Sequence, residues 1–393
     1  MTHRPLRVGM IGIGGFGQVH LTSLRTLAHA NRAKLVAFAD PTAARLPDTV
    51  AALTWEGVAQ YDRFEDMIAR DDIDAVIIAT PIFLHVQQTV ACLAAGKNVY
   101  LEKPPCPTLA EYDQLEAAWR ASGKVCAVGF QMQAAPVFAY ISELVDSGKL
   151  GTLTDVWAAA RWPRDDAYYS RASWSGRYTL NNVPVFDGPA TNALAHVVHA
   201  TSAIAGAPVR VRGALKRARP IESFDTAYIE AETEKNVRLQ LLLTHATQVE
   251  KGPIARLRGT GGEATFDWDM NATFTPTGGE TIALKFPYQN MVSILLNFID
   301  AVETGSEPAT TLPQTLSFLN VVNGALQSGG GITSFDPALI AAVNDDTPKR
   351  LYTVAGLDAD IEAFTDDPAA TPSTVAPGPW VPVDEIGRGL YGV

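Results

Sequence analysis

Five residues near the amino terminus have types and spacing that suit phosphate binding. Segment 12–17 reads G-I-G-G-F-G, a G-x-G-x-x-G pattern at the end of the apolar run RVGMIGI. Such glycines let the chain turn tightly and let its backbone approach a pyrophosphate, which then lies at the amino end of the next helix. The pattern alone is weak, but its place after the first β-rich run of an alternating series strengthens it. The candidate dinucleotide contacts are Gly12, Gly14, Gly15, Phe16 and Gly17.

Asp40 ends the second β-rich run, KLVAFAD, at a distance from the glycines that suits a ribose contact. Its carboxylate can accept hydrogen bonds from the adenosine ribose hydroxyls and repels a 2′-phosphate, which favours NAD over NADP. Arg45 follows closely enough that NADP use stays open. The alternative role for Asp40 is to cap the turn after the strand.

Lys103 stands at the end of another β-rich run, NVYLEKP, directly after Glu102. At the carboxyl end of a parallel strand it faces the ligand crevice, where an ammonium group can stabilise an alkoxide and lower the pKa of a hydroxyl being oxidised. The alternative is a surface lysine paired with Glu102. His20 is expected to hold the first helix in place. The remaining cofactor candidates are Thr80, Pro81, His85 and Glu102.

A second group of polar residues lies on a helix predicted over residues 190–205. Asn192, His196 and His199 stand at i, i+4 and i+7, so they share one face of that helix beside an apolar face. His196 is the candidate general base because an imidazole titrates near neutral pH, with a buried core histidine as the alternative. Asn192 cannot carry charge, but its amide can orient a substrate hydroxyl or His196. His199 is a substrate-site candidate that is expected to support the residues that touch the substrate.

An aromatic, basic segment, RWPRDDAYYSRASWSGRY, precedes this helix. Aromatic faces and planar hydrogen-bond donors suit a sugar ring, which has apolar faces and hydroxyl edges. Trp162 and Tyr168 are therefore candidate substrate contacts, and Gln131, just after the run KVCAVGF, is a third. A loop pinned by aromatic packing is an equally good interpretation of the segment.

The elements that must position these residues fall into two domains. From residue 7 to about 130, five nearly continuous apolar runs alternate with helical stretches, as strands buried on both faces of a parallel sheet require. This predicts an α/β chain whose first domain, residues 1–130, is a doubly wound Rossmann sheet. Longer strand-like segments then predict a second α/β domain, residues 131–393, with a large, mostly antiparallel open sheet and an extended carboxy-terminal tail.

Composition narrows the classes of function. The 393 residues carry a formal net charge of −11 and are 47% hydrophobic, a globular composition without the basic face that nucleic acids require. No apolar run reaches the roughly 18 residues of a membrane span, and the opening MTHRPL leaves no room for a signal peptide, so a cytoplasmic protein is expected. The three cysteines suit neither a disulfide framework nor a zinc cluster, and no metal site is predicted.

Together these motifs resemble the Gfo/Idh/MocA family of glucose–fructose oxidoreductases, inositol dehydrogenases and other sugar dehydrogenases. The resemblance rests on the glycine loop, Thr80-Pro81, the E-K-P element and VGF at 128–130, and it covers residues 7 to about 206. It implies that Lys103 reaches the substrate near the nicotinamide of the cofactor. It also implies a homodimer or homotetramer built on the open sheet of the second domain.

The family's second signature is a glycine-rich approach followed by D-x-x-x-H, and this chain departs from it. His196 matches the histidine, but Asn192 takes the aspartate position, and Gly188 keeps only part of the glycine approach. The expected function is hydride transfer between NAD(P) and a secondary hydroxyl of a sugar, sugar derivative or cyclitol. A redox-neutral NAD-dependent glycosidase and a non-enzymatic sensor of NAD and sugar are the alternatives, and the asparagine weakly favours the sensor.

Overall fold

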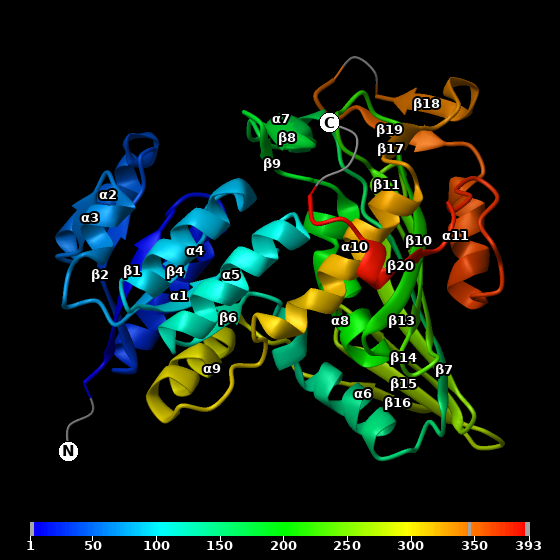
Figure 1. Cartoon of the computed structure of the whole chain (residues 1–393), viewed down its shortest axis with the longest axis horizontal. Coiled ribbons are helices and arrows are strands. Elements are labelled where there is room, and N and C mark those ends of the chain that lie inside the picture. The colour runs from blue at the N-terminus through cyan, green and yellow to red at the C-terminus, as the bar shows by residue number, and fades with distance from the viewer. Residues whose placement is uncertain (1–3, 345–346, 390–393) are drawn as a thin grey trace. The chain divides into compact units, whose positions relative to one another are not determined.

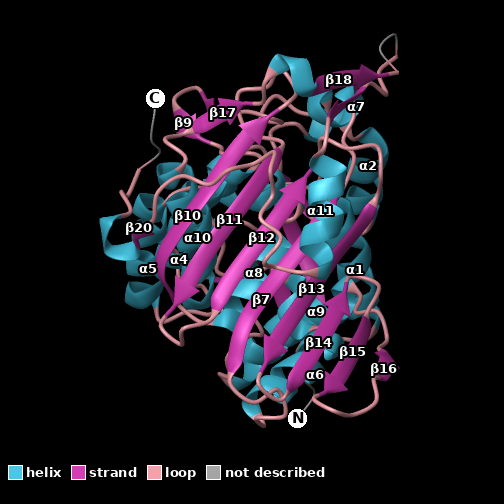
Figure 2. Cartoon of the chain, turned by 90° about the vertical axis from the view of Figure 1, so that its right-hand side faces the viewer, coloured by secondary structure: helices cyan, strands magenta, loops and turns pink. Residues whose placement is uncertain are grey.

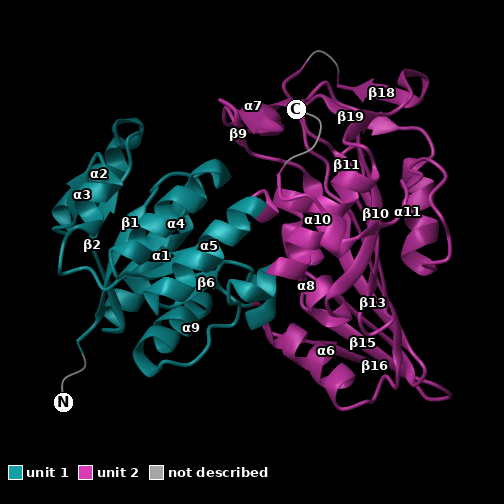
Figure 3. Ribbon diagram, in the orientation of Figure 1, with its two compact units in different colours: residues 1–106, 110–134, 289–315 teal, residues 107–109, 135–288, 316–393 magenta. Residues whose placement is uncertain are grey.

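The computed structural model describes residues 4–344 and 347–389, which belong to two compact units (Figure 1; Figure 3). Unit 1 takes in residues 1–106, 110–134 and 289–315, and unit 2 takes in residues 107–109, 135–288 and 316–393. The sequence-based division at residue 130 did not anticipate that residues 289–315 pack with the first unit.

Unit 1 is built on a parallel six-stranded sheet in the order β3-β2-β1-β4-β5-β6. This is the strand order of a doubly wound Rossmann sheet, as the sequence predicted. The strands are β1 (Leu6–Ile11), β2 (Ala33–Ala39), β3 (Ala59–Tyr61), β4 (Ala75–Ile78), β5 (Asn98–Leu101) and β6 (Cys126–Val128). The helices between them are α1 (Gly17–His29), α2 (Pro47–Trp55), α3 (Phe64–Ile68), α4 (His85–Ala94) and α5 (Leu109–Ser122).

Helix α9 (Met291–Thr304) completes the core of unit 1 although it lies far along the chain. Its buried residues recur at the spacing of one helix face, and they include Met291, Ile294, Leu295, Phe298 and Ile299. These side chains join one hydrophobic cluster with residues of α1, β1 and β2. Because an amphipathic helix must bury its apolar side, tertiary packing here overrides the order of the sequence.

Unit 2 is built on a ten-stranded mixed sheet whose main path runs β16-β15-β14-β13-β7-β12-β11-β10-β17. Only the β12–β7 and β10–β17 pairs are parallel, so the predicted, mostly antiparallel sheet is confirmed. The long strands are β7 (Leu153–Arg161), β10 (Pro208–Arg217), β11 (Thr226–Thr233), β12 (Arg238–Thr244) and β13 (Lys251–Gly259). The shorter ones are β14 (Gly262–Asp267), β15 (Asn271–Pro276), β16 (Ile282–Lys285), β17 (Ile332–Ser334) and β20 (Val381–Pro382).

Helices cover both faces of this sheet. Figure 3 shows α8 (Ala195–Ala205) and α10 (Leu316–Ser328) on one face and α11 (Leu357–Asp366) on the other. The apolar side of α11 consists of Leu357, Ile361 and Phe364, each at most 2% exposed, and packs in one cluster with Trp157 and Leu242 of the sheet. The other helices of the unit are α6 (Pro136–Asp146) and the short α7 (Asp166–Ser170).

Ion pairs fasten α11 at its edges. Arg161 on β7 pairs with Asp358 at 3.4 Å and also with Glu362, which lies 2.8 Å from Lys251. Figure 2 shows α11 lying across the middle of the sheet and leaving β14 to β16 uncovered. The open face that sequence analysis proposed for subunit contact is therefore partly covered by the chain's own carboxy-terminal segment. No helix among the described residues is both long and apolar enough to cross a lipid bilayer.

Candidate active site

The glycine loop joins β1 to α1 in unit 1. Gly12 has a positive φ of 84°, and a Cβ there would lie 2.7 Å from the carbonyl oxygen of Ala79 at the end of β4. Gly15 also has a positive φ, and a Cβ built there meets nothing within 4 Å, so the loop leaves open space on that side. The first turn of α1 holds no acidic residue and no side-chain cap. The positive end of the helix dipole is thus left for an anionic group such as a pyrophosphate.

Asp40 binds the glycine loop directly. One carboxylate oxygen accepts the N–H of Ile13 at 3.0 Å, and the other accepts both the N–H and the hydroxyl of Thr42 at 2.8 Å. The residue is 7% exposed. The turn-capping role that sequence analysis left as an alternative is therefore present, and it coexists with a place at the carboxyl end of β2 that suits a ribose contact.

The E-K-P element follows β5 and is held by a buried pair. Glu102 lies 2.8 Å from Nε2 of His20 on α1, and its second oxygen accepts the backbone N–H of Lys103 at 3.2 Å. His20 and Glu102 are both buried, whereas Lys103 is partly exposed. Glu102 is thus engaged by His20 and by the backbone of Lys103.

His85 connects two of the predicted cofactor segments. Its Nε2 lies 2.9 Å from the carbonyl oxygen of Thr80, and its Nδ1 lies 2.8 Å from that of Pro104. Burial lowers the pKa of His85, and the two carbonyl oxygens partly oppose that effect. Because the ring is 1% exposed, its position suits holding the turn after β4 beside the E-K-P segment. Of the other predicted residues of this unit, Pro81 precedes α4 and Gln131 follows β6, partly exposed.

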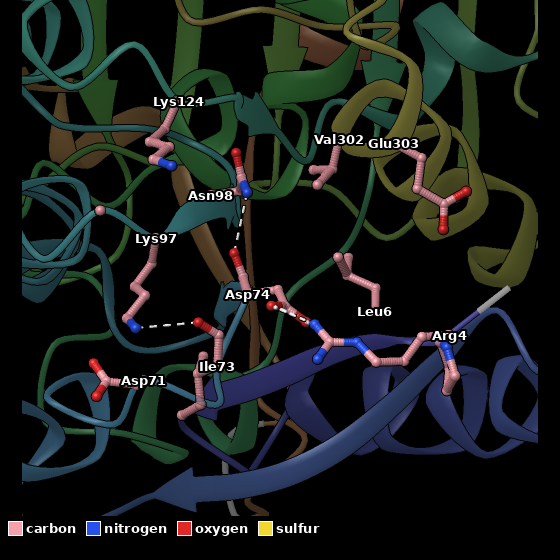
Figure 4. A pocket seen from close by; sticks show the side chains of 12 residues that line it. Arg4, Leu6, Asp71, Ile73, Asp74, Lys97, Asn98, Lys124, Val302 and Glu303 are labelled. Carbon is pink, nitrogen blue, oxygen red and sulfur yellow. Dashed lines mark hydrogen bonds and ion pairs between the residues drawn. The ribbon is translucent and has the colours of Figure 1, made fainter.

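A polar hollow of about 500 Å³ lies at the amino ends of β1, β4 and β5, whereas the glycine loop lies at the carboxyl end of β1 (Figure 4). Two of its cationic groups, Arg4 and Lys97, are engaged within the unit. Arg4 lies 3.1 Å from Asp74, and Lys97 donates to the carbonyl oxygens of Arg70 and Ile73. We assign this hollow no part in cofactor binding, because the glycine loop and Lys103 follow the carboxyl ends of their strands.

In unit 2 the predicted helix over residues 190–205 is interrupted. Residues Pro189–Ala193 form a π-helical turn, and α8 begins at Ala195 after Leu194. Asn192 and His196 are partly exposed, whereas His199 is 1% exposed. The simple i, i+4, i+7 alignment expected for one regular helix therefore does not hold across Leu194.

Asp187, which the sequence analysis missed, lies beside Asn192. Its Oδ1 accepts from the amide Nδ2 of Asn192 at 2.8 Å, and its Oδ2 accepts the N–H of Gly176 at 2.7 Å. The carboxylate is 2% exposed. Gly188 keeps the neighbouring backbone close to Phe224, because a Cβ there would lie 2.4 Å from that ring. The sequence signal was an acidic residue directly before the glycine of the altered signature.

The aromatic segment is packed by its own arginines. The guanidinium carbons of Arg171 and Arg164 lie 3.5 and 4.9 Å from the ring centroid of Tyr168. The indole N–H of Trp162 donates to the carbonyl oxygen of Gly252 at 2.9 Å. The aromatic packing that was one of two equal interpretations is therefore real, while the cationic groups keep the segment suited to polar ligands.

His245, at the end of β12, is a second residue that the sequence analysis missed. Its Nδ1 lies 3.1 Å from the hydroxyl of Tyr169, and its ring is 5.9 Å from that of Tyr168. Burial, followed by the charges of three nearby arginines, holds the pKa of His245 well below its ordinary value, so the ring is neutral at pH 7. Among residues 4–344 and 347–389, no three His, Cys, Asp or Glu side chains are grouped to hold a metal ion.

The fold and the glycine loop define an NAD-binding Rossmann protein with a second, sheet-based domain. Residues 6–130 match the model of the oxidoreductase family with an NAD-binding Rossmann fold, and residues 138–265 match the GFO/IDH/MocA C-terminal domain. The chain belongs to the GFO/IDH/MocA family, as the motifs indicated. The residues of unit 1 suit NAD, because the space beside Gly15 and the uncapped start of α1 offer a cradle for its phosphates.

Relatives within the family act on different compounds. The chain is 35% identical to inositol 2-dehydrogenase of Rhodococcus erythropolis over 41% of this chain and 46% of that protein. It is 29% identical to 4-carboxy-2-hydroxymuconate-6-semialdehyde dehydrogenase of a Sphingobium strain, over 37% and 44% of the two chains. The chain thus matches less than half the length of these curated relatives. The WlbA dehydrogenase of Bordetella pertussis, solved with NADH and UDP-GlcNAcA, has the same fold, with a TM-score of 0.71 at 22% identity over 83% of this chain and 97% of that one.

Proposed function

We propose that this protein is an NAD-dependent dehydrogenase that oxidises a secondary hydroxyl of a sugar, sugar derivative or cyclitol. The observation that carries the proposal is the presence of Lys103 after β5 and His196 at the start of α8, the two positions to which the family resemblance assigns chemistry. The match to an inositol 2-dehydrogenase supports a polyhydroxylated substrate.

Oxidation of a secondary alcohol removes a hydride from carbon and a proton from oxygen, and bound NAD supplies the hydride acceptor. In the proposal, His196 accepts the hydroxyl proton, and the ammonium group of Lys103 stabilises the negative charge that develops on the oxygen. The buried pair of His20 and Glu102 limits the freedom of the chain at Lys103, because Glu102 binds its backbone N–H.

Substrate recognition is proposed for polar groups on both halves of the chain, and these are Gln131, Trp162, Tyr168, Asn192 and His199. Arg164 and Arg171 lie against Tyr168. Their positive charge supports acidic sugars as a substrate class to be tested beside neutral ones. The proposed cofactor contacts besides the glycine loop are Asp40, Thr80, Pro81, His85, Glu102 and Lys103.

The test is a panel of neutral sugars, acidic sugars and cyclitols, each with NAD and with NADP, followed by absorbance of the reduced cofactor. Lys103→Ala and His196→Ala should each lower kcat by about 10²-fold with little change in NAD affinity, because both groups act mainly in the transition state. The exposed residues Lys34 and His29 provide matched controls, Lys34→Ala and His29→Ala, which should leave kcat unchanged.

Other outcomes would point to the alternatives. Normal turnover by His196→Ala would rule out the proposed base. Tight retention of NAD with turnover that needs no added cofactor would instead indicate a redox-neutral glycosidase. Binding of NAD and a sugar without any turnover across the panel would indicate a sensor.

We also propose that the chain assembles as a homodimer or homotetramer. Because α11 covers the middle of the large sheet, a second copy of the chain could bind that face at β14 to β16, which α11 leaves uncovered. The outer side chains there include Thr265 and Thr273, whose hydroxyls lie 2.7 Å apart. A monomer mass by light scattering at micromolar concentration would contradict this proposal.

A further inference from the structure

The altered family signature places two side chains in contact. A carboxylate is absent at position 192, where the family has aspartate, and a carboxylate is present at position 187, directly before Gly188. The two positions meet in the structure, since Oδ1 of Asp187 accepts from Nδ2 of Asn192 at 2.8 Å. Asp187 lies just before the π-helical turn Pro189–Ala193, which carries Asn192.

We propose that Asp187 is a positioning residue that fixes the amide of Asn192, so that the pair supplies the hydrogen-bond acceptor that the family's aspartate supplies alone. This inference rests on the proposed function. A carboxylate accepts hydrogen bonds but cannot donate them, so only the NH₂ side of the Asn192 amide can face Asp187. Because the amide is planar, its oxygen is then directed away from Asp187 and serves as an acceptor for a substrate hydroxyl or for His196.

The same contact explains why this chain has asparagine rather than aspartate at position 192. Two ionised carboxylates at hydrogen-bond distance in a buried setting repel each other strongly. Asp187 is 2% exposed and accepts a hydrogen bond from each of two donors, the side chain of Asn192 and the backbone N–H of Gly176. A second carboxylate at position 192 would remove the donor that Asn192 supplies and add a like charge beside Asp187.

Asp187 also connects the two site segments of unit 2. Gly176 belongs to the aromatic, basic segment, and Asn192 belongs to the turn that leads into α8. After burial, the charge of Asp187 is the next cause that raises the pKa of Tyr168, so the carboxylate acts on the aromatic segment as well. The buried carboxylate therefore sets the position of both segments that carry the proposed substrate contacts.

The test is an exchange of the two side chains in the full-length protein. Asp187→Asn keeps the shape, and its amide oxygen should stay on the backbone N–H of Gly176. Its NH₂ group then faces Asn192, so the Asn192 amide should turn round and present a donor where it presented an acceptor. We expect kcat/KM to fall about 10- to 100-fold, with NAD affinity unchanged. Asn192→Asp places two carboxylates together and should lower kcat/KM at least as much.

The double variant Asp187→Asn/Asn192→Asp is the decisive one. It restores one carboxylate, one amide and the hydrogen bond between them, and it should recover kcat/KM to within about 5-fold of the wild type. Asp155→Asn is the matched control for a loss of stability alone, since Asp155 is 8% exposed and pairs with Arg238 at 2.6 Å on the large sheet. It should leave kcat/KM unchanged.

Three results would overturn the inference. The first is a wild-type kcat/KM for Asp187→Asn. The second is a double variant that folds but has a kcat/KM no higher than that of either single variant. The third is a loss of kcat/KM in Asp187→Asn that is no larger than the loss in Asp155→Asn when the two variants have the same Tm. If Asp187→Asn fails to fold, the double variant alone decides. Calorimetric binding of the best panel ligand repeats the comparison without turnover. Wild-type protein that binds but never turns over would contradict the proposed dehydrogenase, whereas equal affinities of wild type and Asp187→Asn would contradict the role of Asp187.

Discussion

His20 on α1 lies 2.8 Å from Glu102 after β5, and both side chains are removed from solvent. This contact joins the helix that begins at the glycine loop to the element that carries Lys103. Aromatic rings enclose it, because Phe16 and Tyr100 each meet the His20 ring edge-on with centroids 5.4 Å away. The cofactor loop and the proposed catalytic lysine therefore share one buried support.

The first prediction concerns this support. His20→Phe keeps a ring in the cavity but leaves the Glu102 carboxylate buried with only the Lys103 N–H as a donor. We expect the free energy of unfolding to fall by about 3 kcal/mol, as when one partner of a buried pair is removed. Urea unfolding measures it, with His29→Ala on the same helix as the exposed control. An unchanged midpoint and slope of the urea unfolding curve would show that the pair of His20 and Glu102 contributes nothing to the free energy of unfolding.

The second prediction concerns cofactor choice. Asp40→Asn removes the charge that would repel a 2′-phosphate but keeps an oxygen for the N–H of Ile13. The preference for NAD over NADP should narrow by roughly 10-fold, from loss of one charge-assisted contact. The ratio of kcat/KM values for the two cofactors measures it, and Asp48→Asn at an exposed position is the control. Equal use of both cofactors by the wild type would refute the assignment.

The third prediction is a pH dependence that originates at Asp225. This carboxyl is 2% exposed, and burial raises its pKa from 3.8 to about 6, partly offset by the N–H groups of Arg219 and Ala218. Between about pH 4 and 6, Asp225 is therefore more protonated in the folded chain than in the unfolded chain. Its contribution to the free energy of unfolding should fall as the pH rises through that window, by up to about 3 kcal/mol, and level off above it.

Asp225→Asn should abolish that contribution, because the amide does not titrate. Urea unfolding of both proteins at several pH values gives the comparison, in which the other titrating groups cancel. The stability difference between variant and wild type should shift in favour of the variant as the pH rises from 4 to 6. Parallel profiles would mean that Asp225 titrates normally.

The fourth prediction concerns the helix that covers the large sheet. Phe364→Asp places a charge in the apolar contact between α11 and Trp157 and should release the helix. Trp157 is 1% exposed and donates to the carbonyl oxygen of Thr365 at 3.1 Å, so its fluorescence should shift to longer wavelength. Ala363→Asp adds the same charge on the exposed side of α11 and should leave the emission unchanged. A variant with wild-type emission would show that the helix stays in place.

The sequence by itself determined the local parts of this protein. A few consecutive residues specify each of these parts, which are the glycine loop, the apolar runs of the parallel sheet and the E-K-P element. The tight turn requires glycines, and strands buried on both faces require apolar residues. The same holds for His196 as a candidate, since a histidine among polar residues on a predicted helix is visible without a structure.

Only the tertiary structure decided the relationships between distant or irregularly spaced residues. It placed α9 in unit 1 and α11 on the large sheet, since an amphipathic helix does not specify which apolar surface it covers. It revealed the contact between Asp187 and Asn192, because a π-helical turn breaks the periodicity on which sequence reasoning depends. A buried charge is stabilised by the groups that lie close to it in space. Which groups those are depends on the packing of the whole chain and not on their spacing in the sequence.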